Sequence, residues 1–300
     1  MNGRIVFAKP PTTLEQQIAL LRDRGMGIDD ERFAATFLSS VNYYRFCGYA
    51  LHYEEFRDRR RTHHYKPGTT FHDIVSLYEF DSRLRTLLFS FIEHIEVAFR
   101  TAVCLELSLL HANPHWYLDK AVYAPGFDYA RLIDDCGKEF DRSRELFITC
   151  YKEKYSSPKL PPSWMLAEIM PLGTWSKIYC GLARRVDKKT VAKRLDISPW
   201  LLESWIAGLN ALRNMCAHHN RIWNRSFHVQ VRLPESQKPF VRTHDRLAPF
   251  CFAMAALLAP LARRDAFREQ FTQLLGGSPD VPVGKMGFAD SWLECPVWNS

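Results

Sequence analysis

The segment LRNMCAHHNRIWNR at 212–225 concentrates side chains that can bind phosphate or transfer protons. It holds three arginines, two adjacent histidines and three asparagines within fourteen residues, and no Asp or Glu occurs from 204 to 226. Arginine presents fork-shaped donors to phosphate oxygens. Nearby cations favour the neutral form of a histidine, which can accept a proton. These residue types therefore indicate a phosphate site with acid–base capacity.

A regular helix over residues 201–225 would sort these side chains onto separate faces, because each residue turns the helix by about 100°. One face would be apolar and would include His219, which is therefore expected to be a hydrogen-bonded core histidine. An ordinary solvated face is the alternative for the other side, although such faces are usually rich in Glu and Lys. The polar stripe on that side consists of Asn214, His218, Arg221 and Arg225.

Arg213 lies on the shoulder of this stripe, about 140° around the helix from His218. The two side chains would therefore not face each other within one chain. A two-fold axis could bring Arg213 of one chain to His218 of another. The spacing therefore predicts a homodimer whose 201–225 helices pair near these two residues.

Metal-dependent and other familiar catalytic chemistries lack their sequence patterns. The chain contains no HExxH, paired CxxC, P-loop or GxSxG motif, and the adjacent His63 and His64 have no further ligands beside them. The eight cysteines are widely spaced, as is typical of reduced core thiols. We therefore expect neither a metal nor a cofactor. The carboxylate of Glu96 is expected to pair with Arg100, four residues further along one helix.

A second group of cations lies in RDRRRTHHYK at 57–66, which is expected to be a polar loop closed by Pro67 and Gly68. Clustered cations bind nucleic-acid backbones by releasing counterions, and a solvated loop is the alternative. The formal net charge of +7 is a mild bias toward polyanions. The expected RNA contacts in this segment are Arg57, Arg59, Arg60, Arg61 and Lys66.

The rest of the chain has hydrophobic residues at helical spacing and no strand pattern long enough to require a sheet. The strongest segment, 71–110, is expected to form two helices that break near Asp81. Ser198 and Pro199 favour a helix start, as a cap and a first-turn proline. Further helices are expected at 14–25, 31–41, 128–155, 164–183 and 247–275, the fourth with a kink near Pro171–Gly173.

These patterns predict a single all-α unit over residues 1–300. It would comprise an N-terminal helical extension at 1–70, a helical core at 71–275 and an irregular tail at 276–300. The longest apolar run, at 247–262, contains two prolines, so it indicates a buried helix and no membrane span. Because the first residues lack an apolar signal core, the protein is expected in the cytoplasm.

Five patterns follow one another along the chain: KPPTTLEQQIALLRDRGMGIDD, NYYRFCGY, LYEFDSRLRTLLFSFIEHIEVAFRTAV, PPSWMLAEIMPLGTWSKIY and LRNMCAHHNRIWNR. In this order they resemble the Abi-like (AbiD/AbiF) abortive-infection proteins of bacteria, which belong to the HEPN superfamily. Arg213, Asn214 and His218 fit the Arg-polar-x-x-x-His pattern of HEPN ribonucleases. The resemblance implies an all-α, HEPN-like helical bundle with additional N-terminal helices and insertions.

The resemblance also implies metal-independent cleavage of RNA in phage defence, in which a ribose 2′-OH attacks the adjacent phosphate and leaves a cyclic phosphate and a 5′-OH. His218 would transfer the proton, Arg213 would stabilise the transition-state charge, and Asn214 would orient the substrate or His218. Arg221 and Arg225 would contact RNA. His219 also fits the family's looser spacing. The alternatives are a non-catalytic RNA-binding protein that partners a small structured RNA, and a structural dimer with a polar interface at 212–225.

Overall fold

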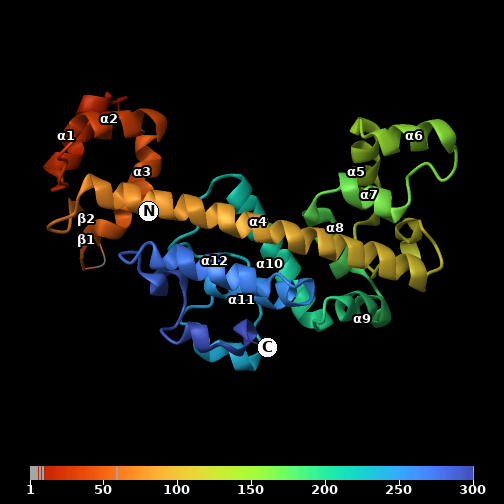
Figure 1. Ribbon diagram of the computed structural model, residues 1–300. Helices are drawn as coiled ribbons and strands as arrows, with labels where there is room; N and C mark the ends of the chain where they lie inside the picture. The colour runs from red at the N-terminus through yellow and green to blue at the C-terminus, as the bar shows by residue number, and fades with distance from the viewer. Residues whose placement is uncertain (1–5, 7, 9, 59, 300) are drawn as a thin grey trace. The chain divides into compact units, whose positions relative to one another are not determined.

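The computed structural model describes residues 6, 8, 10–58 and 60–299, which are mostly helical (Figure 1). The expected all-α fold class is confirmed. The chain packs as two compact units, 1–82 and 83–300. The helices and strands are α1 Leu14–Asp23, α2 Glu31–Ser40, α3 Tyr43–Ala50, β1 Glu54–Arg57, β2 Arg60–Tyr65, α4 Phe71–Leu110, α5 Tyr129–Arg142, α6 Leu146–Lys154, α7 Ser163–Ile169, α8 Leu172–Gly181, α9 Arg185–Arg194, α10 Pro199–Ala217, α11 Ala248–Leu258 and α12 Arg264–Gly276. Eight short 3₁₀ turns also occur in the described part: Leu51–Tyr53, Trp116–Leu118, Lys120–Val122, Glu235–Phe240, Ala259–Leu261, Val283–Met286, Trp292–Glu294 and Pro296–Trp298.

In the unit 1–82, short helices pack through aromatic side chains against the first part of α4. Phe46 of α3 stacks on Phe71 with ring centroids 4.6 Å apart, and Phe37 of α2 meets both rings edge-on. Tyr49 donates a hydrogen bond of 2.7 Å to the buried carboxylate of Asp81. Because this polar residue has a partner inside the unit, α4 continues through it as one helix. The predicted break near Asp81 is wrong.

The segment after α3 forms a two-stranded antiparallel sheet instead of the expected loop. Glu54 pairs with Tyr65 and Arg57 with Arg60 in the register of β1 and β2. Glu54 is only 2% exposed, and Arg61 donates bonds of 2.7 and 2.5 Å to its two carboxylate oxygens. A bidentate ion pair thus stabilises the hairpin. Because most residues of the segment are polar, it lacks the apolar alternation by which strands are recognised in sequence.

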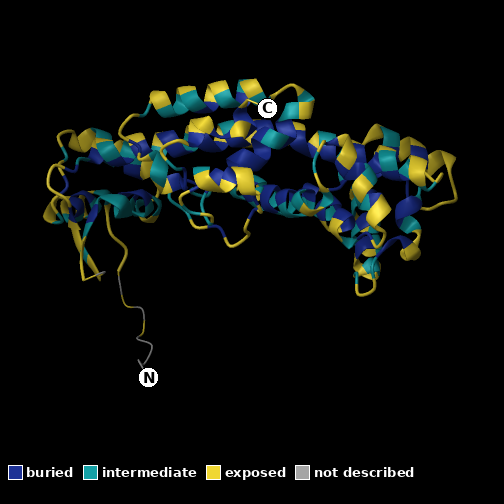
Figure 2. Cartoon of the chain, turned by 90° about the horizontal axis from the view of Figure 1, so that it is seen from below, coloured by how far each residue is buried: buried dark blue, intermediate teal, exposed yellow. Residues whose placement is uncertain are grey.

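In the unit 83–300, α10 packs against α8, α9 and α11. Nearly every residue of α11 is buried, and α12 packs on it. Figure 2 shows the other helices with buried and exposed faces. None of the helices in the described ranges is long and apolar enough to cross a membrane.

Three of the helices expected in this unit are each two helices. The segments 128–155, 164–183 and 247–275 form α5 with α6, α7 with α8, and α11 with α12. The breaks have local causes: Pro171 caps α8, and Ala262 after Pro260 has a positive φ of 53°.

Candidate active site

Helix α10 positions the first half of the 212–225 segment. Ser198 caps it by accepting a hydrogen bond from the backbone N–H of Leu201, and Pro199 follows in the first turn, as predicted. The indole Nε1–H of Trp205 donates to the carbonyl of Arg232 at 2.7 Å. The apolar side of α10 holds the helix in the core. Its buried residues include Leu202, Trp205, Ile206, Leu209, Leu212 and Cys216.

The helix ends at Ala217, so the prediction of a regular helix to 225 is wrong. His219 adopts a left-handed φ of 56° and donates its N–H to Cys216 O at 3.0 Å, while Asn220 N–H donates to Met215 O at 2.9 Å. These two bonds form a Schellman motif, with His219 where glycine is usual. Histidine tolerates this conformation better than most residues. Because of the turn, His219 is exposed and not the predicted core residue.

The chain after the turn is an anchored loop. Ile222 and Trp223 are almost completely buried, so they fix the loop against the unit. Asn224 has a positive φ of 51°, and its Oδ1 accepts a hydrogen bond of 3.0 Å from Arg246 Nη1. Arg246 lies outside the motif, and no local pattern pointed to it.

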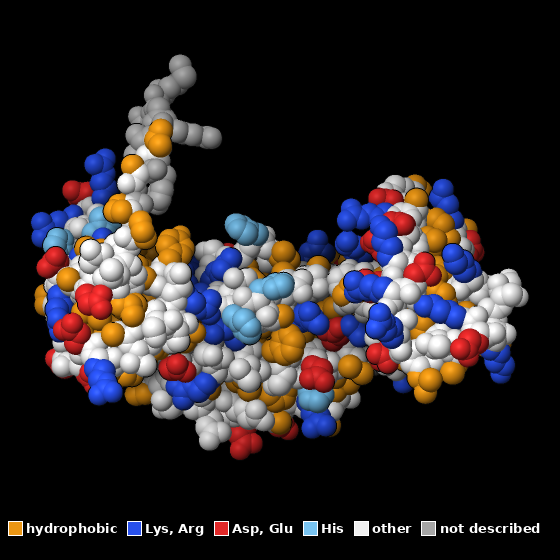
Figure 3. Space-filling model, turned by 90° about the horizontal axis from the view of Figure 1, so that it is seen from above, with side chains coloured by type: hydrophobic (Ala, Val, Ile, Leu, Met, Phe, Trp, Pro, Cys, Tyr) orange, Lys and Arg blue, Asp and Glu red, His pale blue; other side chains and the backbone are white. Residues whose placement is uncertain are grey.

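The structure brings together only some of the predicted site residues. Asn214 and His218 are exposed one turn apart at the end of α10, and His218 N–H donates to Asn214 O at 2.9 Å. Arg221 and Arg225 are half-buried on the loop, so the predicted helical stripe does not form. No hydrogen bond or ion pair between described residues joins Arg213 to His218. Figure 3 shows histidine side chains grouped on one face, with Lys and Arg side chains beside them.

Arg213 instead contacts α4. Its Nε lies 3.5 Å from Glu96 Oε2, an ion pair without an aligned hydrogen bond, and its guanidinium carbon lies 5.6 Å from the ring centre of Phe89. Glu96 also pairs with Arg100, so the predicted i,i+4 pair is confirmed. Arg100 in turn donates to the carbonyl of Ala167 at 3.2 Å. About a third of the Arg213 side chain, 34%, remains exposed.

The surroundings of Arg213 are therefore of mixed charge. A cavity of about 260 Å³ is lined by two carboxylates and two guanidinium groups: Glu93 and Glu96 with Arg100 and Arg213. The fold supplies from α4 the acidic residues that 204–226 lacks in sequence. Spacing along one helix could not reveal this contact, because it joins residues far apart in the chain.

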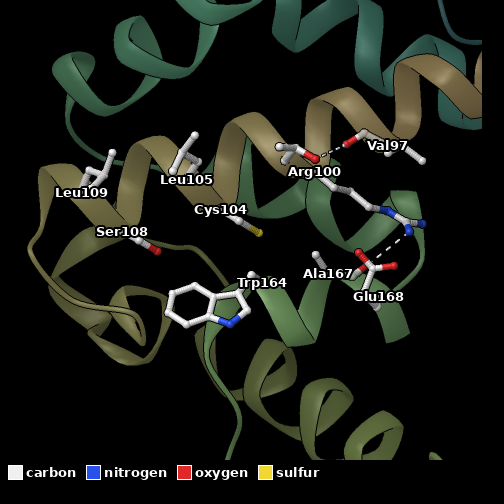
Figure 4. Close-up of a pocket in the computed structure, with 10 residues that line it drawn as sticks. Val97, Arg100, Cys104, Leu105, Ser108, Leu109, Trp164, Ala167 and Glu168 are labelled. Atoms are coloured by element: carbon white, nitrogen blue, oxygen red, sulfur yellow. Dashed lines mark hydrogen bonds between the residues drawn. The ribbon is translucent and has the colours of Figure 1, made fainter. Parts of the chain in front are cut away.

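A second cavity of about 410 Å³ lies further along α4, between that helix and α7 (Figure 4). Cys104, Leu105, Leu109 and Trp164 line it with apolar surface. Burial raises the pKa of the Cys104 thiol to about 12, so the thiol stays neutral and is not a nucleophile near neutral pH. Arg100, Thr101 and Ser108 also line this cavity, but its exposed surface is mostly apolar.

The predicted basic contacts at 57–66 divide into two kinds. Arg57 and Arg60 are exposed and paired across the strands. Arg61 is held by Glu54, and Lys66 Nζ donates to the carbonyl of His52 at 3.0 Å. Arg59 lies outside the described residues. Among the described residues of this group, Arg57, Arg60 and Lys66 are thus the cations that no carboxylate neutralises.

The structure defines a helical protein with an arginine, an asparagine and an exposed histidine at the end of one helix. A family model described as Abi-like protein matches residues 36–224, more than half of the chain and all of α10. The chain therefore belongs to the Abi-like family, which associates it with abortive infection, a defence against phage. No curated protein and no solved structure matches the chain. Over the described ranges, no group of three or more His, Cys, Asp or Glu is arranged to hold a metal ion.

Proposed function

We propose that this protein is a metal-independent endoribonuclease of the HEPN type that acts in the cytoplasm in abortive infection. The observation that carries the proposal is the exposed His218 at the end of α10, with Asn214 one turn before it and Arg213 next to Asn214. All three lie inside the segment matched by the Abi-like family. An exposed imidazole at a helix end can approach a ribose–phosphate backbone, as proton transfer requires.

In the proposed reaction, His218 accepts the proton of a ribose 2′-OH, and that oxygen attacks the adjacent phosphorus. The bond from phosphorus to the 5′-oxygen breaks, leaving a 2′,3′-cyclic phosphate. The departing oxygen takes a proton from a water molecule and becomes a 5′-OH, and His218 returns its proton to the solvent. Arg213 stabilises the charge on the phosphate oxygens, and Asn214 orients the substrate.

A second copy of the chain completes this site. No hydrogen bond or ion pair between described residues joins Arg213 to His218 within one chain, and the exposed Phe89 of α4 lies beside Arg213. Phe89 and Val97 are exposed apolar residues of α4, about 80° apart around the helix, and both line the cavity that Arg213 also lines. We infer that a second copy packs on this exposed apolar surface, so that His218 of the partner subunit approaches Arg213.

The test compares wild type with Arg213→Ala, His218→Ala and His219→Ala on a mixed RNA pool with a chelator present. The first two variants should lose cleavage by about 10² or more, while His219→Ala retains it. The cleavage products should end in cyclic phosphate. Circular dichroism of each variant, compared with wild type, controls for folding. Wild type that binds RNA without cleaving it, with binding weakened in the Arg213 and His218 variants, would favour the non-catalytic partner of a structured RNA.

Mixing the Arg213→Ala and His218→Ala proteins tests the composite site. A mixed dimer keeps one intact Arg213–His218 combination if the two residues come from different chains. Equal mixing should then restore about a quarter of wild-type activity. A fully active monomer, or no restoration on mixing, would show that one chain contains the whole site.

A further inference from the structure

A polar cavity of about 390 Å³ lies beside the end of the anchored loop, formed by segments that the site above does not use. It is lined by Asn224, Arg242, Thr243, Arg246, Pro282, Gly284 and Lys285. Three of these side chains are permanent or near-permanent cations, and two others offer an amide and a hydroxyl. We propose that this cavity binds backbone phosphate of RNA. The proposal rests on the proposed function, whose substrate path it extends.

Backbone hydrogen bonds hold the cavity together. Arg242 N–H donates to Gly287 O at 2.8 Å, and Ala289 N–H donates to Phe240 O at 3.0 Å, so the segments 240–246 and 282–289 are clasped side by side. Gly287 has a φ of +91°, and a Cβ there would lie 2.6 Å from Arg246 Cβ. The close approach of the two segments therefore depends on this glycine.

The cations are only partly neutralised. Arg242 Nη2 lies 3.0 Å from both carboxylate oxygens of Asp290, and Arg246 Nε lies 3.8 Å from Asp245 Oδ1. Lys285 is exposed, and its ammonium has neither an ion pair nor a hydrogen bond to a described residue. The Arg242–Asp290 pair is largely solvent-exposed, so a phosphate can compete with the carboxylate.

The ligand follows from the donors and from the walls. Two guanidinium forks and an ammonium match the oxygens of a phosphate. The lining contains no aromatic ring on which a base could stack, so the sugar–phosphate backbone is the part recognised. Asn224, bonded to Arg246, ends the family-matched segment that contains Arg213 and His218. The subsite is thus tied to the proposed active site through the anchored loop.

The experiment measures binding of a labelled 2′-O-methyl RNA to the full chain over a range of salt. This RNA keeps the phosphates but lacks the attacking hydroxyl, so it is not cleaved. Lys285→Ala and Arg242→Ala should each weaken binding several-fold and lower the slope of log affinity against log salt by about 0.7. Asp290→Asn should tighten binding. Lys193→Ala, which removes an exposed cation of α9 elsewhere, is the matched control and should change neither quantity.

Unchanged affinity and slope in both cation variants would overturn the subsite, while cleavage of ordinary RNA by wild type would leave the proposed function standing. RNA binding without cleavage, sensitive to Lys285 and Arg242, would remove the nuclease and keep the subsite. Titration with inorganic phosphate tests whether the cavity binds a free phosphorylated ligand instead of RNA. Tight phosphate binding without any effect of the variants on RNA would assign the cavity to a free phosphorylated ligand and overturn the RNA assignment.

Discussion

Replacing Gly208 by alanine should destabilise the unit that carries α10, although alanine is the better helix former. An added Cβ would lie 2.6 Å from Val231 Cγ2 and 3.3 Å from Phe250 Cε1, and both neighbours are buried. Overpacking costs about 1–3 kcal/mol, whereas alanine gains about 1 kcal/mol of helix propensity. Because Val231 is β-branched and cannot rotate away freely, we expect a net loss of about 1–2 kcal/mol.

The matched control is Gly137, inside α5 of the same unit. A Cβ there meets nothing within 4 Å, so Gly137→Ala should stabilise the protein by roughly 0.5–1 kcal/mol. Urea unfolding followed by tryptophan fluorescence compares the two variants with wild type, provided that the m-values agree. If Gly208→Ala raises the midpoint as Gly137→Ala does, the close packing of α10 against Val231 and Phe250 is refuted.

Two further predictions concern the hairpin and alkaline pH. Arg61→Ala leaves the carboxylate of Glu54 buried without its cation and should cost about 2 kcal/mol, below the usual figure for buried pairs because Arg61 is partly exposed; Arg60→Ala should stay within about 0.5 kcal/mol. Equal unfolding midpoints for these two variants, by circular dichroism, would contradict the role of the pair. Burial raises the pKa of Cys104 and of Cys136 from 9.0 to about 12, so their contribution to stability is full below pH 9 and is lost as pH rises toward 12. Urea midpoints measured across this range should fall less when both cysteines are replaced by alanine, and an unchanged fall would exclude them as a cause.

The start of α10 was predictable from sequence and its end was not, for a physical reason. Ser198 and Pro199 act through local geometry that their residue types announce. The end depends on His219 in a left-handed conformation, for which glycine is the usual signal. Extending the helix to 225 placed His219 in the core and joined Arg221 to His218, and both inferences failed together.

The same distinction applies to the contacts of the candidate site. The Glu96–Arg100 pair follows from the i,i+4 rule within one helix, and it is confirmed. The Glu96–Arg213 contact joins two helices, so it depends on how the unit packs. The buried Asp81 shows the converse. A polar residue in an apolar segment suggested a helix break, but Tyr49 supplies its hydrogen bond and the helix continues.

Because of the contacts of the anchored loop, the segment matched by the family model is not a stable fragment by itself. The match ends at Asn224, yet that residue is held by Arg246, and α10 packs against α11, beyond the matched segment. A protein cut to 36–224 would keep Arg213, Asn214 and His218 but would expose the apolar side of α10 that α11 covers. Such a fragment would tend to aggregate, and its inactivity would say nothing about the chemistry of those residues. Any dissection of the candidate site must therefore retain the C-terminal helices.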